Sequence, residues 1–170
     1  LMSGFMLLVS HFGEMDPSIT PRMPVLNSPL LSIHVSIIMI SYALFSLTFI
    51  CAIAYFLTYR SKKANIIQTN KQLTTLSQIF LYPAITTLGL GIFIGAIWAN
   101  ISWGTYWGWD PKETWALITL MVYAIVLHKQ SLPTFRKPLN YHLYMIIAFL
   151  SILMTYFGVN YVLGGMHSYA

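Results

Sequence analysis

Long apolar runs alternate along this chain with shorter segments that hold most of the charged residues. Four runs are long enough to approach or cross a lipid bilayer, at about residues 30–59, 73–101, 113–129 and 141–163. About 20 helical residues, each rising about 1.5 Å, cross a hydrocarbon core of about 30 Å. Because lipid offers no hydrogen bonds to the backbone, long uninterrupted runs predict helices. The sequence therefore predicts an all-α integral membrane protein, a polytopic bundle of transmembrane helices.

The beginning of the chain differs from these four runs. Residues 1–12 are apolar, but they are too few to span a membrane and lack the charged start of a signal peptide. We expect them to be the C-terminal part of a truncated transmembrane helix, followed by an external loop over residues 13–29. Residues 30–170 then form one membrane domain with four transmembrane helices, the third of which is the shortest as a purely apolar run.

Composition supports a membrane location. The chain is 57% hydrophobic and 8% charged, whereas soluble domains carry about 25% charged residues. The net charge of +5 does not indicate nucleic-acid binding, because the basic residues fall in short clusters between apolar runs rather than in one patch. The single cysteine, Cys51, lies in an apolar run, so an internal disulfide and a CxxC redox pair are excluded and a packed core residue is expected.

The distribution of charge predicts the orientation of the chain. The connections after the first and third runs contain no acid, and their basic residues are Arg60, Lys62, Lys63, Lys71, Lys129, Arg136 and Lys137. Loops of this kind stay on the cytoplasmic side of a membrane. The segment 13–29, the loop after the second run and the end of the chain alternate with them, so all three are expected to face outward.

An aromatic segment follows the second run. Residues 103–115 read WGTYWGWDPKETW and hold four of the 5 tryptophans of the chain. An interfacial belt of indoles accounts for one or two of them, whereas four interleaved with glycines favour a flat aromatic platform for a planar apolar ligand. Asp110, Pro111 and Glu113 also fit an N-cap, a first helical residue and a capping box, so a structural role for the two acids is as well supported as a ligand role.

Two histidines, His34 and His167, are expected on the same outer face as this segment. Haem iron accepts an imidazole on each axial side, and two histidines without thiolates or carboxylates make a poor zinc site. The pair therefore predicts a clamp around a porphyrin. His128 lies at the inner end of the third run, where an ionisable side chain indicates function. His142 is either the partner of His128 or, as we favour, an anchor at the membrane interface. His11 is interpreted as an interfacial anchor too.

The segment 103–115 resembles the WWD signature of the haem-handling family that includes CcsA, ResC and CcmC. Its WGWDPKE form is closer to CcsA of the system II pathway of cytochrome c biogenesis. The similarity extends over nearly the whole chain and includes residues 28–35, 157–160 and 165–169. Residues 15–21 resemble bacterial proteins in which CcsA is fused behind its partner CcsB.

The resemblance implies roles for individual residues. His34 and His167 match the two external histidines that ligate haem iron in this family. His128 matches a ligand of a second, intramembrane haem site, whose other ligand lies upstream in the fused proteins. The haem-presenting segment of the family matches Trp103, Trp107, Trp109, Asp110 and Trp115.

The resemblance also implies a cofactor, an activity and partners. The cofactor is haem b, delivered across the membrane to the external bis-histidine and tryptophan-rich site. The activity is that of a holocytochrome c synthase (a cytochrome c haem-lyase) acting within a larger polypeptide or complex, which presents haem for thioether attachment to the CxxCH motif of apocytochrome c. The expected partners are apocytochrome c, a CcsB/ResB-type protein or fused upstream region, and the lipid bilayer. The expected location is a bacterial inner membrane, with the WWD loop facing the periplasm.

Two other functions fit the same residues. A haem exporter or chaperone would hand haem to another carrier without covalent attachment, as CcmC does. A structural or transport subunit would have an aromatic belt and hold no haem. Supplying an apocytochrome and looking for covalent haem separates the exporter from a synthase. A pyridine haemochrome assay on the purified protein, which would detect no haem, identifies the structural or transport subunit.

Overall fold

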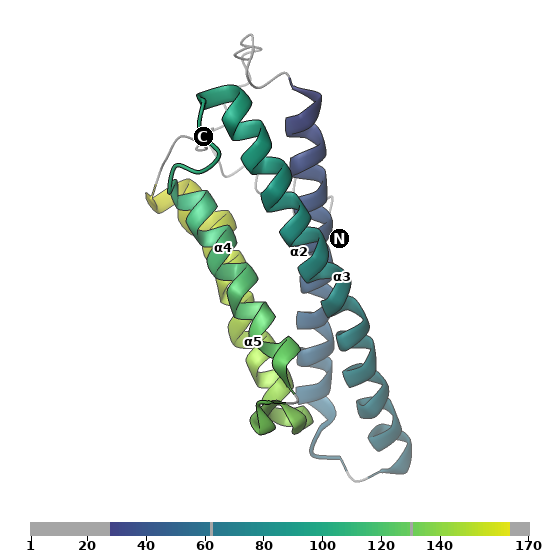
Figure 1. Ribbon diagram of the computed structural model, residues 1–170. Helices are drawn as coiled ribbons and strands as arrows, with labels where there is room; N and C mark the ends of the chain where they lie inside the picture. The colour runs from purple at the N-terminus through teal and green to yellow at the C-terminus, as the bar shows by residue number, and fades with distance from the viewer. Residues whose placement is uncertain (1–27, 62, 130, 164–170) are drawn as a thin grey trace, which may run out of the picture.

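The computed structural model describes residues 28–163, apart from residues 62 and 130 and the side chain of residue 162. This part of the chain contains no strand, and its helices are α2 (Pro29–Thr58), α3 (Ala64–Trp103), α4 (Pro111–Ala124) and α5 (Pro138–Leu153) (Figure 1). Two short 3-10 segments, η2 (Ile125–His128) and η3 (Pro133–Arg136), follow α4, and a π-helical segment, η4 (Met154–Leu163), continues α5. The prediction of an all-α membrane protein is confirmed.

Three of these helices are long and apolar enough to cross a membrane. They are α2, α3 and the continuous helix Pro138–Tyr161 formed by α5 and most of η4. α4 has 14 residues and is too short alone. Because the four residues of η2 extend it, the pair rises about 29 Å, close to the hydrocarbon thickness of about 30 Å. The third expected span is therefore helical and only just as long as a bilayer core.

α3 continues well beyond its apolar run. The run predicts a helix over residues 73–101, whereas α3 has 40 residues and begins at Ala64. A helix of this length rises about 60 Å, twice the hydrocarbon core. Its first turns hold exposed Asn65, Gln68 and Lys71. The apolar pattern marks only the part of a helix that suits lipid, so it does not detect this polar extension.

The helices form two layers that share one core. α2 and α3 run antiparallel and pack against each other, while α4 and α5 lie side by side against them (Figure 1). Phe45, Leu88, Tyr123 and Met145 meet where the layers join, and all four have 0% of their surface exposed. The Phe45 and Tyr123 rings stack with centroids 3.9 Å apart. This stack ties α2 to α4 across the bundle.

His142 lies inside the bundle, and the prediction of an interfacial anchor is wrong. The side chain has 0% exposure and its ring stacks on Tyr55, with centroids 4.3 Å apart. The Thr74 hydroxyl donates to the Asn70 carbonyl, so it accepts a hydrogen bond from His142 Nε2–H over 3.0 Å. Partners on α2 and α3 accommodate the polar ring. Cys51 is buried, as expected.

The two ends of the bundle differ in charge. One end, called the basic end here, holds the connection from α2 to α3 and the residues between α4 and α5, with Arg60, Lys63, Lys71, Lys129, Arg136 and Lys137. The other end, called the tryptophan-loop end, gathers the start of α2, the end of α3, the loop 104–110, the start of α4 and the end of η4 (Figure 1).

Candidate functional site

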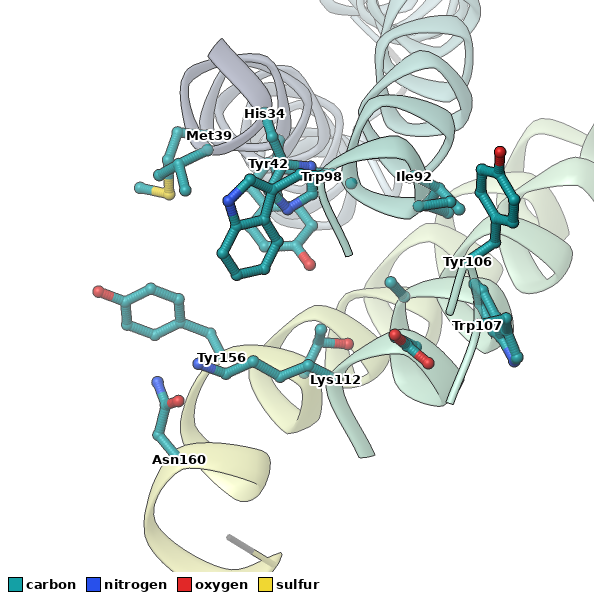
Figure 2. A pocket seen from close by; sticks show the side chains of 17 residues that line it. His34, Met39, Tyr42, Ile92, Trp98, Tyr106, Trp107, Lys112, Tyr156 and Asn160 are labelled. Atoms are coloured by element: carbon teal, nitrogen blue, oxygen red, sulfur yellow. The ribbon is translucent and has the colours of Figure 1, made fainter. Parts of the chain in front are cut away.

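A cavity of about 220 Å³ opens at the tryptophan-loop end. Its walls come from α2, α3, α4, η4 and the loop 104–110, so residues far apart in the sequence share it. Its lining includes His34, Tyr42, Trp98, Trp107, Lys112 and Asn160 (Figure 2). Aromatic walls with a few convergent polar groups are typical of a site for a small organic molecule or cofactor.

His34 is held in one orientation by the neighbouring helix. It lies in the second turn of α2, and its Nδ1 is 2.8 Å from the carbonyl oxygen of Gly91 on α3. A carbonyl only accepts hydrogen bonds, so Nδ1 carries the proton and Nε2 carries the lone pair in the neutral ring. Metal-ligating histidines use this arrangement, in which a backbone acceptor fixes the tautomer and the ring plane.

Gly95 provides the space that the His34 ring occupies. A methyl group at this position would lie 2.6 Å from His34 Cε1 and 2.8 Å from Nδ1. One turn earlier, a methyl group at Gly91 would lie 2.5 Å from the Ile38 Cδ1 atom. The two glycines therefore form a shallow groove on α3 that receives α2, and the groove is closed at Gly95 by the imidazole itself.

Hydroxyl groups line the floor of the cavity. The Tyr42 and Thr155 side chains both line the cavity. The Thr155 hydroxyl also lies 3.1 Å from that of Thr119 and donates to the Ser151 carbonyl over 2.7 Å. These side chains come from α2, α4 and η4, and Thr119 is fully buried and does not itself line the cavity.

The loop between α3 and α4 is shaped by helix-capping interactions. Gly104 ends α3 in the left-handed conformation, with φ 79°. Asp110 is the N-cap of α4, Pro111 follows at N1, and the Asp110 carboxylate accepts from the Lys112 backbone N–H over 3.0 Å. The Glu113 carboxylate accepts from the N–H groups of Gly108 and Asp110. The predicted N-cap and capping box are confirmed, and they account for both acids structurally.

The tryptophans of the loop occupy different environments. Trp107 lines the cavity, and Trp109 meets it edge to face with ring centroids 5.9 Å apart. Trp109 is 71% exposed and adopts a positive φ of 55°, a strained conformation for a bulky residue. Trp103 packs edge to face on buried Trp98 at 5.6 Å. Trp115 is half-buried outside the lining. Instead of one flat platform, the aromatic residues therefore form two separate pairs, Trp98 with Trp103 and Trp107 with Trp109.

Of the two other predicted iron ligands, His128 is in the described residues and does not line this cavity. His128 is exposed at the basic end, and its Nδ1–H donates to the Ala124 carbonyl over 3.2 Å. This hydrogen bond places the proton on Nδ1, so Nε2 carries the lone pair of the neutral ring, as in His34. His167 lies outside the described residues, as does His11.

Several lining residues were not singled out by sequence reasoning. Tyr42, Trp98, Tyr156 and Asn160 all line the cavity with His34. Tyr42 and Asn160 are polar positions inside apolar runs, which was a usable signal because polar side chains in membrane spans are seldom without a role. The spacing of Gly91 and Gly95 by one turn was a second signal, since small residues at this spacing permit close helix packing.

Comparison with known proteins identifies the relatives of this chain. A family model described as cytochrome c assembly protein matches residues 1–167. Protein NrfI of Wolinella succinogenes is 42% identical over 173 residues, covering 100% of this chain and 19% of that protein. Cytochrome c biogenesis protein CcsA of Chlamydomonas reinhardtii is 36% identical over 155 residues, covering 88% of this chain and 43% of that protein. CcsA of Synechococcus sp. strain CC9605 is 34% identical, with coverages of 89% and 59%.

The chain spans less than two thirds of the length of each of these relatives. The match to the family model nevertheless extends over almost all of the chain. This chain therefore belongs to the cytochrome c assembly protein family, whose members act in cytochrome c biogenesis.

Proposed function

We propose that this chain binds haem b in the cavity at the tryptophan-loop end and presents it for thioether attachment to the CxxCH motif of an apocytochrome c. The observation that carries the proposal is the His34 imidazole. Its proton is held on Nδ1 by the Gly91 carbonyl, and its ring lies among the aromatic walls of the cavity. This donor set and these walls fit haem, which needs an axial imidazole and apolar contact with its faces.

In this reaction the chain has to position the reacting groups and does not have to supply a nucleophile. A thiol adds across a vinyl double bond, with sulfur bonding to one carbon and hydrogen to the other, so atoms and electrons balance without an oxidant. Both thiols belong to the apocytochrome, which fits a chain whose one cysteine, Cys51, is buried. Holding reacting groups in contact lowers a barrier by about 7–11 kcal/mol in favourable cases.

The other parts of the proposal concern His167, which lies outside the described residues, and His128. His167 is the proposed second axial ligand of the external site. His128, whose ring lies exposed at the end of η2, is the proposed ligand of an intramembrane site that receives haem before it reaches the cavity. The basic end faces the cytoplasm, and the tryptophan-loop end faces the periplasm of a bacterial inner membrane.

Haem absorption spectra of single-histidine variants test the proposal. We expect purified His34→Ala protein to lose most of the haem of the external site, measured as pyridine haemochrome, and exogenous imidazole to restore part of it. Lys137→Met is the matched control, because Lys137 is exposed at the basic end, outside the cavity, and is not a proposed haem ligand. Full haem retention by His34→Ala would contradict the proposal.

A haem exporter that hands its cargo to another carrier is the second candidate. The 71% exposure of Trp109 at the tip of the loop suits either a carrier or an apocytochrome as receiving partner. Incubation with an apocytochrome that carries a CxxCH segment, followed by haem staining of a denaturing gel, separates the two. Covalent haem supports a synthase, whereas haem that stays non-covalent supports an exporter.

A further inference from the structure

The cavity wall opposite His34 carries a small polar group drawn from two elements. Lys112 is in the first turn of α4, and Tyr156 and Asn160 lie one turn apart on η4. All three line the cavity and are half-buried. In Figure 2 the Lys112 side chain points toward the side of the cavity where Tyr156 and Asn160 lie, and His34 and Trp98 are on the opposite side.

We propose that Lys112, Tyr156 and Asn160 form the subsite that receives the propionate carboxylates of haem. The inference rests on the proposed function and adds the recognition of one edge of the porphyrin. Haem carries its two carboxylates on a single edge, so a site that binds it in one orientation needs donors gathered on one wall. An ammonium, a phenol and an amide supply them.

Lys112 places a positive charge on the cavity wall at the start of α4. It occupies the second residue of α4, and a cation in the first turn opposes the positive end of the helix dipole. Among the described residues that line the cavity, it is the one lysine or arginine. The charge of Asp110 attracts that of Lys112. The Asp110 and Glu113 carboxylates also accept hydrogen bonds from backbone N–H groups in the capping box of α4.

Asn160 and Tyr156 strengthen the case from the other side of the cavity. Both lie in a π-helical segment at the end of an apolar run, and π-helical turns occur frequently at functional sites. Asn160 adds an amide that can donate hydrogen bonds to a carboxylate, and Tyr156 adds a phenol that can do the same. The cavity brings both side chains onto the wall toward which Lys112 points (Figure 2).

The arrangement also fixes which edge of the porphyrin reaches the loop. With the carboxylate edge at Lys112 and η4, the remaining edges point toward the side of the cavity formed by Tyr106 and Trp107 (Figure 2). The vinyl groups lie on the porphyrin away from the propionates. They therefore face the aromatic loop, where an extended peptide from an apocytochrome has access.

The test compares haem with its dimethyl ester, in which both propionates are capped. Binding of iron protoporphyrin IX and of the ester is titrated into the purified, haem-depleted protein in detergent micelles. We expect the wild type to bind haem at least about tenfold more tightly than the ester, as befits charge-assisted hydrogen bonds. Lys112→Met should lose most of this preference, and Lys112→Arg should keep it. Tyr156→Phe and Asn160→Leu should each reduce the preference a few-fold.

Lys137→Met is the matched control, because it removes the same charge from an exposed position at the basic end. An unchanged preference for haem over the ester in Lys112→Met overturns the subsite, as does an equal loss of affinity for both ligands. Failure of the proposed function would give a different result. Neither haem nor the ester would then bind through His34, so the affinities of His34→Ala for both ligands would equal those of the wild type.

Discussion

Gly95→Ala is expected to disable the His34 ligand while leaving the fold intact. The added methyl group would lie 2.6 Å from His34 Cε1 and 2.8 Å from Nδ1. Carbon atoms in favourable contact are about 3.5–4.0 Å apart, so the ring has to move by about 1 Å. The bond between Nδ1 and the Gly91 carbonyl, 2.8 Å long, would then stretch beyond hydrogen-bonding distance.

The expected magnitude follows from that lost bond. Removing the partner that orients a metal-ligating histidine lowers metal affinity about 10- to 100-fold. This corresponds to about 1.4–2.8 kcal/mol of binding free energy. The effect on folding is smaller, because overpacking costs about 1–3 kcal/mol and alanine recovers about 1 kcal/mol of helix propensity. Haem affinity should therefore fall more than thermal stability does.

The assay titrates haem into the purified variant and records both affinity and the Soret band. Gly89→Ala is the matched control on the same helix, because no atom lies within 4 Å of the position of its new methyl group. It should bind haem as the wild type does. The double variant Gly95→Ala, His34→Ala should bind no more weakly than His34→Ala alone. Wild-type affinity and spectrum in Gly95→Ala would refute this reasoning.

Three further predictions concern the loop and the core. Asp110→Ala should lower the free energy of unfolding by about 0.5–2 kcal/mol through loss of the N-cap, with Asp110→Asn close to wild type in a thermal unfolding assay. Tyr123→Phe should leave stability unchanged or raise it by up to about 1–3 kcal/mol, because its buried hydroxyl has no hydrogen-bond partner in the described structure; a clear loss of stability would show that the hydroxyl is used. Trp107→Leu should reduce bound haem, since Trp107 lines the cavity, whereas Trp109→Leu should retain haem and reduce its transfer to an apocytochrome.

Local interactions made part of this architecture predictable. The capping box of α4 follows from the order Asp110, Pro111, Glu113, because all of its bonds join residues within one turn. The four helical regions follow from apolar runs long enough for a bilayer. The beginning of α3 was less predictable, because a polar stretch of helix outside the membrane leaves no apolar pattern to detect.

Long-range contacts made the rest unpredictable. The bond between His34 and Gly91 joins residues 57 apart, and nothing near either of them indicates it. His142 looks like an interfacial residue in the sequence, and only the arrival of Tyr55 from α2 and Thr74 from α3 shows that it is buried. The division of the loop tryptophans between two pairs depends on Trp98, which belongs to α3 rather than to the loop.

The packed core separates the two proposed haem sites. The cavity and His128 lie at opposite ends of α4 and η2, and the stacked rings of Phe45 and Tyr123, both with 0% exposure, close the bundle between α2 and α4. Passage of a porphyrin through the interior would require this stack to open, whereas passage along the outer face of α4 would not. Met121 and Ile125 are exposed on that face, at helical spacing from His128.

Transfer along the outer face would make haem delivery insensitive to the packing of the core. Phe45→Leu should therefore lower the free energy of unfolding by about 1–3 kcal/mol and leave the ratio of haem at the external site to haem at His128 unchanged, measured from the spectra of the single-histidine variants. Met121→Arg, which places a charge on the exposed face, should instead reduce haem at the external site. An altered haem ratio in Phe45→Leu, together with normal delivery in Met121→Arg, would place the route inside the bundle.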